Sequence, residues 1–222
     1  MSNEIRLRIA EPTRYGKCYT CGYMFLFARF TGLRIGEECA LMKDDIEWDK
    51  NRIHVHQQQL CDKETKEYYL APYLKEENDK KEISDGRYVP LLPEAREILK
   101  ELLEKQQEAN IHSKWLFANQ DGSWIKKESQ YTQFLERLSD KFGFKVKNHH
   151  AIRKYYNSYI LVPNGIEVAD RAKIMGHSIE TNQKYYTFEH HDYCELAFEK
   201  LTKSHKPGNN EVVTAGYGTN RK

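Results

Sequence analysis

The sequence has no apolar run long enough for a signal peptide or a membrane-spanning helix. It also has no compact cluster of Asp and Glu residues of the kind that holds two catalytic metal ions. Its cysteines are odd in number and scattered, at positions 18, 21, 39, 61 and 194, so they do not describe a disulfide framework. These absences favour a reducing cytoplasmic location, no membrane partner and a chemistry without a metal.

One cysteine pair, Cys18 and Cys21, has the spacing of a zinc or redox motif. A four-ligand zinc site of this type needs a second pair at a suitable distance, and the sequence has none. We therefore interpret both residues as ordinary thiols on a helix.

Net charge is small, because the formal value is +2 and the isoelectric point is near 8.1. The total decides nothing about a nucleic-acid partner, but the distribution of charge is more informative. Residues 141–186 hold eight Lys and Arg against three acids, whereas residues 94–108 hold five acids against three bases. This asymmetry predicts one acidic face and one basic face, and the basic face suits a bound polyanion.

The chain has 222 residues, which is enough for one domain with a substantial core. No internal repeat is visible, and only residues 206–222 have the composition of a linker. We expect a single domain over residues 1–205, followed by a flexible C-terminal tail.

Hydrophobic periodicity predicts an α+β fold that is mainly helical, with a small antiparallel sheet. Alternating apolar residues around Asn51 predict a β-hairpin, and residues 68–70 and 88–91 have the character of strands, the latter at a sheet edge. Pro93 occupies the first turn of a predicted amphipathic helix. Other helices are predicted over residues 35–42, 126–141, 150–161, 167–175, 179–186 and 191–203, after an apolar segment at 25–30.

Four short motifs carry the functional signal: Thr31-Gly32-Leu33-Arg34, His150-Ala151-Ile152-Arg153, Gly176-His177-Ser178 and Tyr185-Tyr186. Each has an ordinary explanation when it stands alone. A His and an Arg three apart can be a solvated helix face, and a His after Gly can cap a helix. Arg34 can pair with Glu37 or Glu38, and most tyrosines are packed rings. Together they fit a phosphodiester site, because guanidinium groups hold a negative transition state that a phenolic oxygen can attack.

In this order and spacing, the motifs resemble the catalytic domain of the tyrosine recombinases, the phage integrase family. The resemblance extends from about residue 25 to residue 188 and includes Tyr88-Val89-Pro90-Leu91. It implies a site with two arginines, a lysine on a β-hairpin, two histidines and a tyrosine nucleophile. Matched one at a time, these are Arg34, Lys81, His150, Arg153, His177 and Tyr186.

Two of these matches have a neighbouring alternative. Lys80 is the reserve for Lys81, because both precede the strand at residues 88–91. Tyr185 competes with Tyr186 for the role of nucleophile, and only one of them can face the site, because consecutive helical side chains diverge by about 100°. The spacing from His177 and the following Thr187 favour Tyr186.

The resemblance implies site-specific DNA recombination, in which duplex DNA is cut and rejoined through a 3′-phosphotyrosine on Tyr186. The two arginines would grip the phosphate while His177 donates a hydrogen bond to it. His150 would help to remove the phenolic proton, and Lys81 would protonate the departing 5′ oxygen. This chemistry needs no metal or other cofactor.

Further expectations follow from the same resemblance. The partners are double-stranded DNA and other copies of the chain, as a tetramer on DNA and a monomer in solution, in a bacterial or phage-encoded cytoplasmic system. The alternatives are DNA relaxation of the type IB topoisomerase kind and a non-catalytic DNA-binding regulator. Departures from the family pattern are Lys154 where histidine is common, a long polar insertion near residues 61–75, and no preceding core-binding domain. With that domain absent, we expect weak and salt-sensitive DNA binding.

Overall fold

The computed structural model describes residues 20–74, 85–143, 148–186 and 198. The chain divides into two units, Met1–Thr187 and Phe188–Lys222, and all elements below belong to the first. Of the second unit only Phe198 is described, so the expected tail and the helix over residues 191–203 stay predictions. Among the described residues, no helix is long and apolar enough to cross a membrane.

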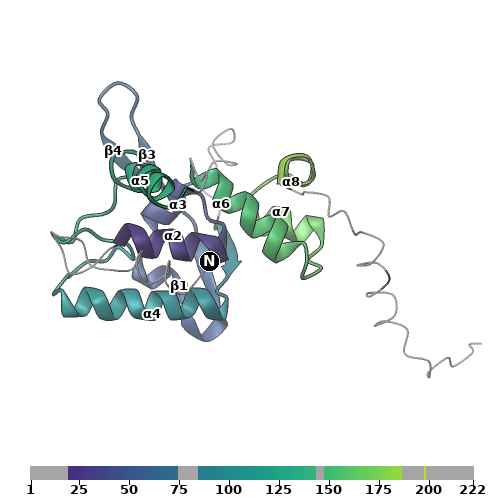
Figure 1. Cartoon of the computed structure of the whole chain (residues 1–222), viewed down its shortest axis with the longest axis horizontal. Coiled ribbons are helices and arrows are strands. Elements are labelled where there is room, and N and C mark those ends of the chain that lie inside the picture. The colour runs from purple at the N-terminus through teal and green to yellow at the C-terminus, as the bar shows by residue number, and fades with distance from the viewer. Residues whose placement is uncertain (1–19, 75–84, 144–147, 187–197, 199–222) are drawn as a thin grey trace, which may run out of the picture. The chain divides into compact units, whose positions relative to one another are not determined.

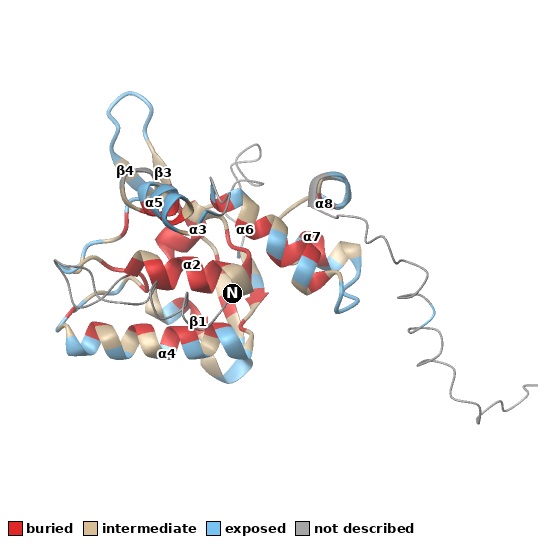
Figure 2. Ribbon diagram, in the orientation of Figure 1, coloured by how far each residue is buried: buried red, intermediate tan, exposed pale blue. Residues whose placement is uncertain are grey.

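Helix α2, Thr20–Thr31, lies at the centre of the main core (Figure 1). Nine of its twelve residues are buried, so it is enclosed on nearly every side and cannot be recognised by an amphipathic pattern. Helix α4, Pro93–Glu108, packs beside it and has Pro93 at its first turn, as predicted. Figure 2 shows α2 coloured as buried along its length, whereas α4 is buried mainly on one side.

A three-stranded antiparallel sheet has the order β1, β2, β5. Strands β1, Ile46–Glu47, and β2, Arg52–Val55, form the predicted hairpin, in which Asn51 has the left-handed conformation with φ of 49°. Among the described residues, strand β5, Arg87–Pro90, pairs with β2 alone, in agreement with the predicted edge strand. Ile53 faces Val89 in this register, and both are fully buried.

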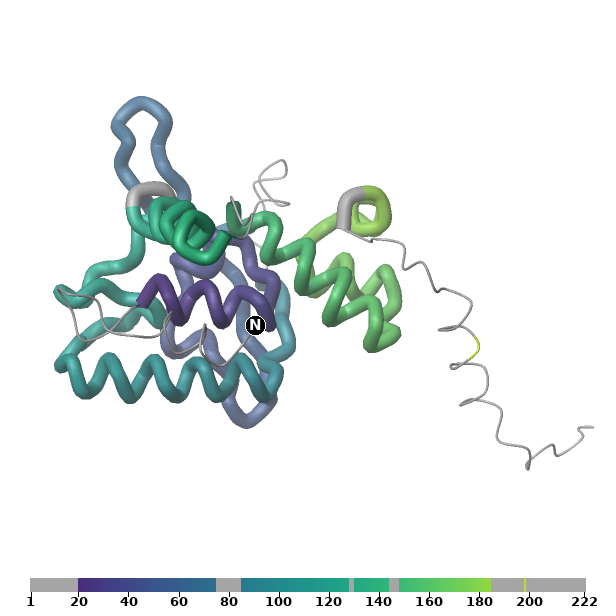
Figure 3. Tube along the Cα trace, in the orientation of Figure 1, coloured from purple at the N-terminus to yellow at the C-terminus, as the bar shows by residue number. Residues whose placement is uncertain are grey.

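A second sheet joins β3, Gln58–Cys61, to β4, Tyr68–Ala71, as an antiparallel pair whose connecting loop projects from the fold (Figures 1 and 3). Strand β4 was expected, but β3 was not, because its residues are polar. The side chains of Gln57, Gln58 and Gln59 are buried and donate hydrogen bonds to main-chain carbonyl oxygens. Polar residues thus occupy buried positions that a hydrophobic pattern cannot reveal.

The other helices agree with the predicted ranges to within a few residues. Two of them include a π-helical stretch, which the periodicity did not indicate. Figure 3 shows the second of these, α6 with its π-helical continuation, as one uninterrupted helix. The bounds are α3 Ile35–Ala40, a π-helix Lys127–Tyr131 leading into α5 Thr132–Phe142, α6 His149–Tyr155 with a π-helix Tyr156–Leu161, α7 Val168–Met175 and α8 Ile179–Tyr186; short 3-10 turns lie at Lys43–Asp45 and Trp48–Lys50.

Candidate active site

Arg34 lies at the start of α3, directly after the turn at Gly32 and Leu33. Gly32 has φ of 60°, and a Cβ atom there would lie 2.4 Å from the ring of Tyr156, so only glycine fits this position. Glu37, in the first turn of α3, accepts the backbone N–H of Arg34 at 2.8 Å and its guanidinium at 2.9 Å. The ordinary ion pair that the sequence allowed for Arg34 is therefore present.

Glu37 also binds a second arginine and lies close to a third. Arg87 of β5 donates two hydrogen bonds to its carboxylate, at 2.9 and 2.7 Å, and Nη1 of Arg153 lies 4.0 Å from it. Burial alone would raise the pKa of Glu37, but Arg87, followed by Arg34 and Arg153, holds this pKa well below its usual range. One carboxylate thus faces three guanidinium groups, which leaves positive charge available for an anion.

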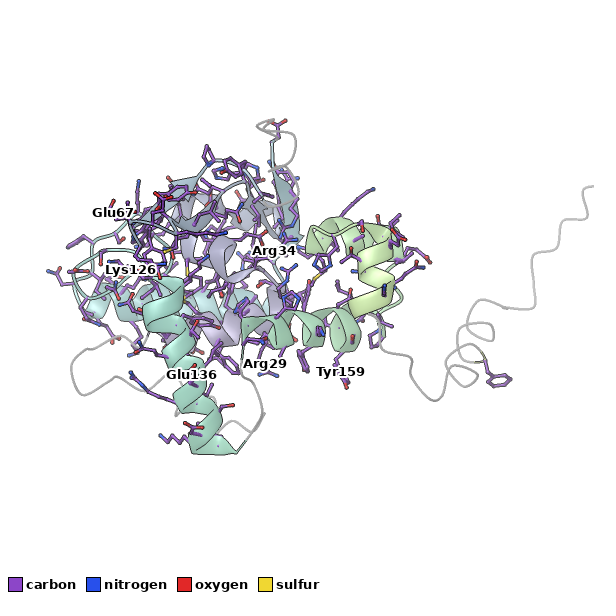
Figure 4. All side chains as sticks on the ribbon, turned by 90° about the horizontal axis from the view of Figure 1, so that it is seen from above. Arg29, Arg34, Glu67, Lys126, Glu136 and Tyr159 are labelled. Carbon is purple, nitrogen blue, oxygen red and sulfur yellow. The ribbon has the colours of Figure 1, made fainter. Side chains whose placement is uncertain are left out.

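Arg153 reaches the same place from α6. Its guanidinium donates to the carbonyl oxygens of Gly32 and, at 2.6 Å, Met175, whereas Arg34 donates to the carbonyl of Gly176. The two arginines therefore converge on neighbouring carbonyl groups, as the motifs predicted. Arg153 is only 1% exposed, whereas the Arg34 side chain is 18% exposed. Figure 4 shows Arg34 where the α2–α3 region meets the later helices.

His177 follows α7, which ends at Gly176 in a left-handed conformation. Its Nε2 lies 2.9 Å from Nη2 of Arg153. Because a guanidinium can only donate, this nitrogen accepts, and the neutral ring carries its proton on Nδ1. Burial first, and then the charges of Arg153 and Arg34, lower the pKa of His177 to about 3. The imidazole is therefore uncharged at neutral pH.

The two adjacent histidines of α6 have different environments. Asn148 caps this helix by accepting the backbone N–H of Ala151. His150 is exposed and lies on the same helix as Arg153, three residues before it. His149 is buried and contacts Leu33 instead.

Two predicted catalytic residues cannot be placed from the described part of the chain. Lys81 and its alternative Lys80 lie outside the described residues. The backbones of Tyr185 and Tyr186 form the end of α8, but their side chains are likewise outside the description. The roles of these residues, and the choice between the neighbours, stay predictions.

Sequence reasoning missed two residues of this charged cluster, Glu37 and Arg87. Glu37 was considered only as a possible partner of Arg34, although a glutamate three residues into a helix is the usual position for a capping contact. Arg87 directly precedes the recognised segment at residues 88–91, and its Nε donates to the carbonyl of Ile174 at 3.0 Å. That contact depends on tertiary packing between β5 and α7, so no local sequence pattern could predict it.

The donors of the site suit an anion rather than a cation. Within the described ranges, no three His, Cys, Asp or Glu side chains are placed to hold a metal ion. Cys21 is a free thiol on α2, and burial raises its pKa to about 12, whereas Cys18 lies outside the described residues.

Comparisons with known proteins identify the family and the fold. The model of the phage integrase family matches residues 7–192. The fold is similar to that of the Tn1549 transposon integrase in complex with circular intermediate DNA, with a TM-score of 0.66 and 22% identity over 90% of this chain and 64% of that one. No curated protein sequence matches.

Two recombinases show the same fold. The XerA recombinase has a TM-score of 0.58 and 19% identity, over 93% of this chain and 63% of that one. The XerH site-specific recombinase bound to a palindromic difH substrate has a TM-score of 0.57 and 19% identity, over 90% and 51%. The chain thus spans less than two thirds of the length of these solved relatives.

Proposed function

The chain belongs to the phage integrase family, and from this premise we propose that it performs site-specific recombination by cutting and rejoining duplex DNA. The observation that carries the proposal is the convergence of Arg34 and Arg153 beside His177. Three residues remote in the sequence come together, and the two guanidinium groups among them match a phosphodiester in charge and in hydrogen-bonding capacity.

In the proposed reaction, Arg34 is the more accessible of the two phosphate-binding arginines, because its side chain retains some exposure. Arg153 is held by main-chain carbonyl groups, so its buried guanidinium supplies positive charge at a fixed position. Glu37 orients the guanidinium groups without cancelling their total charge. Such preorganised donors stabilise a transition state more than the ground state, because they need no reorganisation as charge develops.

Tyr186 is the proposed nucleophile, at the end of the helix that follows His177. Its phenolic oxygen attacks phosphorus and forms a 3′-phosphotyrosine, while the bond to the 5′ oxygen breaks. His150 takes up the phenolic proton, and Lys81 protonates the 5′ oxygen. A hydroxyl group from another strand then displaces Tyr186 by the reverse route, so cutting and joining use the same groups.

Assembly as a tetramer on DNA is part of the proposal. Exchange between two duplexes cuts four strands, and each chain offers one tyrosine, so four copies are required. We propose that the protein is a monomer in free solution. It acts on double-stranded DNA in the cytoplasm of a bacterial host, and its gene belongs to a phage or another mobile element. The solved relatives are an integrase and two recombinases, so DNA relaxation of the topoisomerase kind is not favoured.

A nicked duplex that traps the covalent intermediate tests this function. Made from the DNA that flanks the gene, it should give a protein–DNA adduct that survives denaturation. Tyr186→Phe should abolish the adduct, whereas the matched control Tyr185→Phe should retain it. An adduct that persists in Tyr186→Phe and is lost in Tyr185→Phe would move the nucleophile by one residue. If the unmodified protein forms no adduct, the proposed function is wrong and the alternative of a non-catalytic DNA-binding regulator remains.

A further inference from the structure

Helix α6 holds two consecutive carbonyl groups directly before Arg34. Arg153 donates to the carbonyl of Gly32, and Nε2 of His149 lies 2.6 Å from the carbonyl oxygen of Leu33. His149 and Arg153 are four residues apart, so they project from the same face of the helix. Both are nearly inaccessible, at 6% and 1% exposure, and Leu33 is fully buried. The turn that precedes Arg34 is therefore bound to α6 by two hydrogen bonds.

The contact of His149 fixes the position of its proton. A carbonyl oxygen can only accept, so Nε2 of His149 carries the hydrogen and donates it to Leu33. Burial lowers the pKa of this imidazole to about 4, so the ring is neutral at physiological pH. The ring of Tyr131 packs edge-on against it, with centroids 5.5 Å apart, which restricts its rotation. The donor is thus held in one tautomer and one orientation.

Glu38 completes the surroundings of His149. It follows Glu37 on α3 but faces a different environment, with its Oε2 3.8 Å from Nε2 of His149. It is completely buried, and neither carboxyl oxygen has a hydrogen-bond partner among the described residues. Burial therefore raises its pKa well above the usual range and favours the protonated form. Of the two neighbouring acids of α3, only Glu37 then competes for the arginines.

We propose that His149 is a positioning residue for strand cleavage, which holds the Leu33 carbonyl and thereby keeps the guanidinium of Arg34 in register with that of Arg153. This inference rests on the proposed function. His149 touches no reacting atom and acts through the backbone of the Gly32–Leu33 turn. A displacement of about 1 Å in a catalytic group can slow a reaction about 100-fold, so the loss of one such contact can affect the rate strongly.

Two substitutions of His149 separate positioning from packing. His149→Gln places an amide N–H near the position of the Nε2–H, whereas His149→Leu keeps an apolar side chain without the donor. With a nicked duplex in single-turnover reactions at saturating protein, His149→Leu should form the covalent adduct at least about 10-fold more slowly, with its DNA affinity changed less than about 2-fold. His149→Gln should recover most of the rate.

A core variant serves as the control for general destabilisation. Leu102→Ala removes a fully buried side chain of α4, which packs on α2 and lies outside the site. It should lower the melting temperature as much as His149→Leu or more, yet cleave at the rate of the unmodified protein well below that temperature. If His149→Leu cleaves as fast as Leu102→Ala, the positioning role is refuted.

Hydrogen exchange gives a readout that does not depend on activity. His149→Leu should increase amide exchange in residues 32–36, whereas His149→Gln and Leu102→Ala should leave it unchanged. Unchanged exchange in His149→Leu would overturn the inference even if cleavage slowed. If the unmodified protein forms no adduct, the proposed function fails and the role in cleavage fails with it, while the exchange data still report whether His149 holds the turn.

Discussion

At the scale of single residues, the site is organised by one buried carboxylate and three guanidinium groups. Glu37 is completely buried and would be costly there as an isolated anion, but Arg87 and Arg34 bind it directly and Arg153 lies nearby. A guanidinium can serve a carboxylate with one edge and a phosphate with another, because its five donors are spread over a plane. Glu37 therefore fixes the arginines without using up their capacity for DNA.

Glu37→Gln tests this account at the level of stability. The substitution keeps the size of the side chain but removes the charge, so buried guanidinium groups lose their counterion. We expect a loss of about 3 kcal/mol in the free energy of unfolding, measured by urea denaturation. Glu47→Gln is the matched control, because Glu47 also binds one arginine through both oxygens, at 2.9 and 3.2 Å, but at the surface. A loss in Glu37→Gln no larger than that of the control would contradict the central role of Glu37.

The convergence of Arg34 and Arg153 was predictable from the resemblance to the family, which the order and spacing of the motifs carry. The contacts of Arg87 were not, because its partners Glu37 and Ile174 come from α3 and from α7. The burial of Glu38 and His149 was not predictable either, since each is polar and neither has a local pattern that distinguishes it from a solvated residue. Pairs that form only through tertiary packing leave no periodic trace in one sequence.

At the scale of elements, helix ends and turns place the functional groups. Arg34 begins α3, and His177 follows the end of α7. Hydrophobic periodicity predicted α4 well because that helix is amphipathic, with one buried face. It failed for β3, whose buried glutamines Gln58 and Gln59 bond to the main chain, and it could not show the π-helical stretches. Those features depend on hydrogen bonds rather than on the spacing of apolar residues.

Gly176→Ala should damage the site through the end of α7. Gly176 has φ of 61°, and an added Cβ atom would lie 3.0 Å from Nη1 of Arg34 and from Cζ of Arg87. The left-handed conformation alone costs about 1 kcal/mol for alanine. The crowding should in addition displace the guanidinium groups and slow formation of the covalent adduct at least about 10-fold.

Gly143→Ala separates the conformational cost of alanine from the crowding of the guanidinium groups. Gly143 ends α5 with φ of 68°, and an added Cβ atom there would meet no atom of the described residues within 4 Å. This control should lose a similar conformational energy, about 1 kcal/mol in urea unfolding, and cleave at the normal rate. Equal cleavage rates in the two alanine variants would show that the close approach at Gly176 has no influence on the arginines.

At the scale of the whole molecule, the site forms only when the first unit is folded. Its groups come from α3, β5, α6 and the turn after α7, and hydrogen bonds from side chains to main-chain carbonyls join these segments. The charges in this unit also couple its stability to pH. Glu37 and Glu38 are neighbours whose pKa values move in opposite directions, since Glu37 is surrounded by arginines and Glu38 by neutral groups.

The pH dependence of folding should reveal the protonated state of Glu38. The groups around it stay neutral between pH 5 and 7, because burial lowers the pKa of His149 to about 4 and raises those of Tyr131, Cys39 and Cys21. An acid with a raised folded pKa contributes stability below its unfolded pKa, near 4.3, and loses it as the pH rises toward the folded pKa.

Glu38→Gln, which cannot ionise, should therefore gain stability relative to the unmodified protein as the pH rises from 5 to 7. The difference in free energy of unfolding should grow by up to about 1.4 kcal/mol per pH unit until the folded pKa is reached. Because both proteins carry Glu37, its opposite contribution cancels in the difference. A difference that stays flat across this range would show that Glu38 is already ionised in the folded protein at pH 5 while His149 stays neutral.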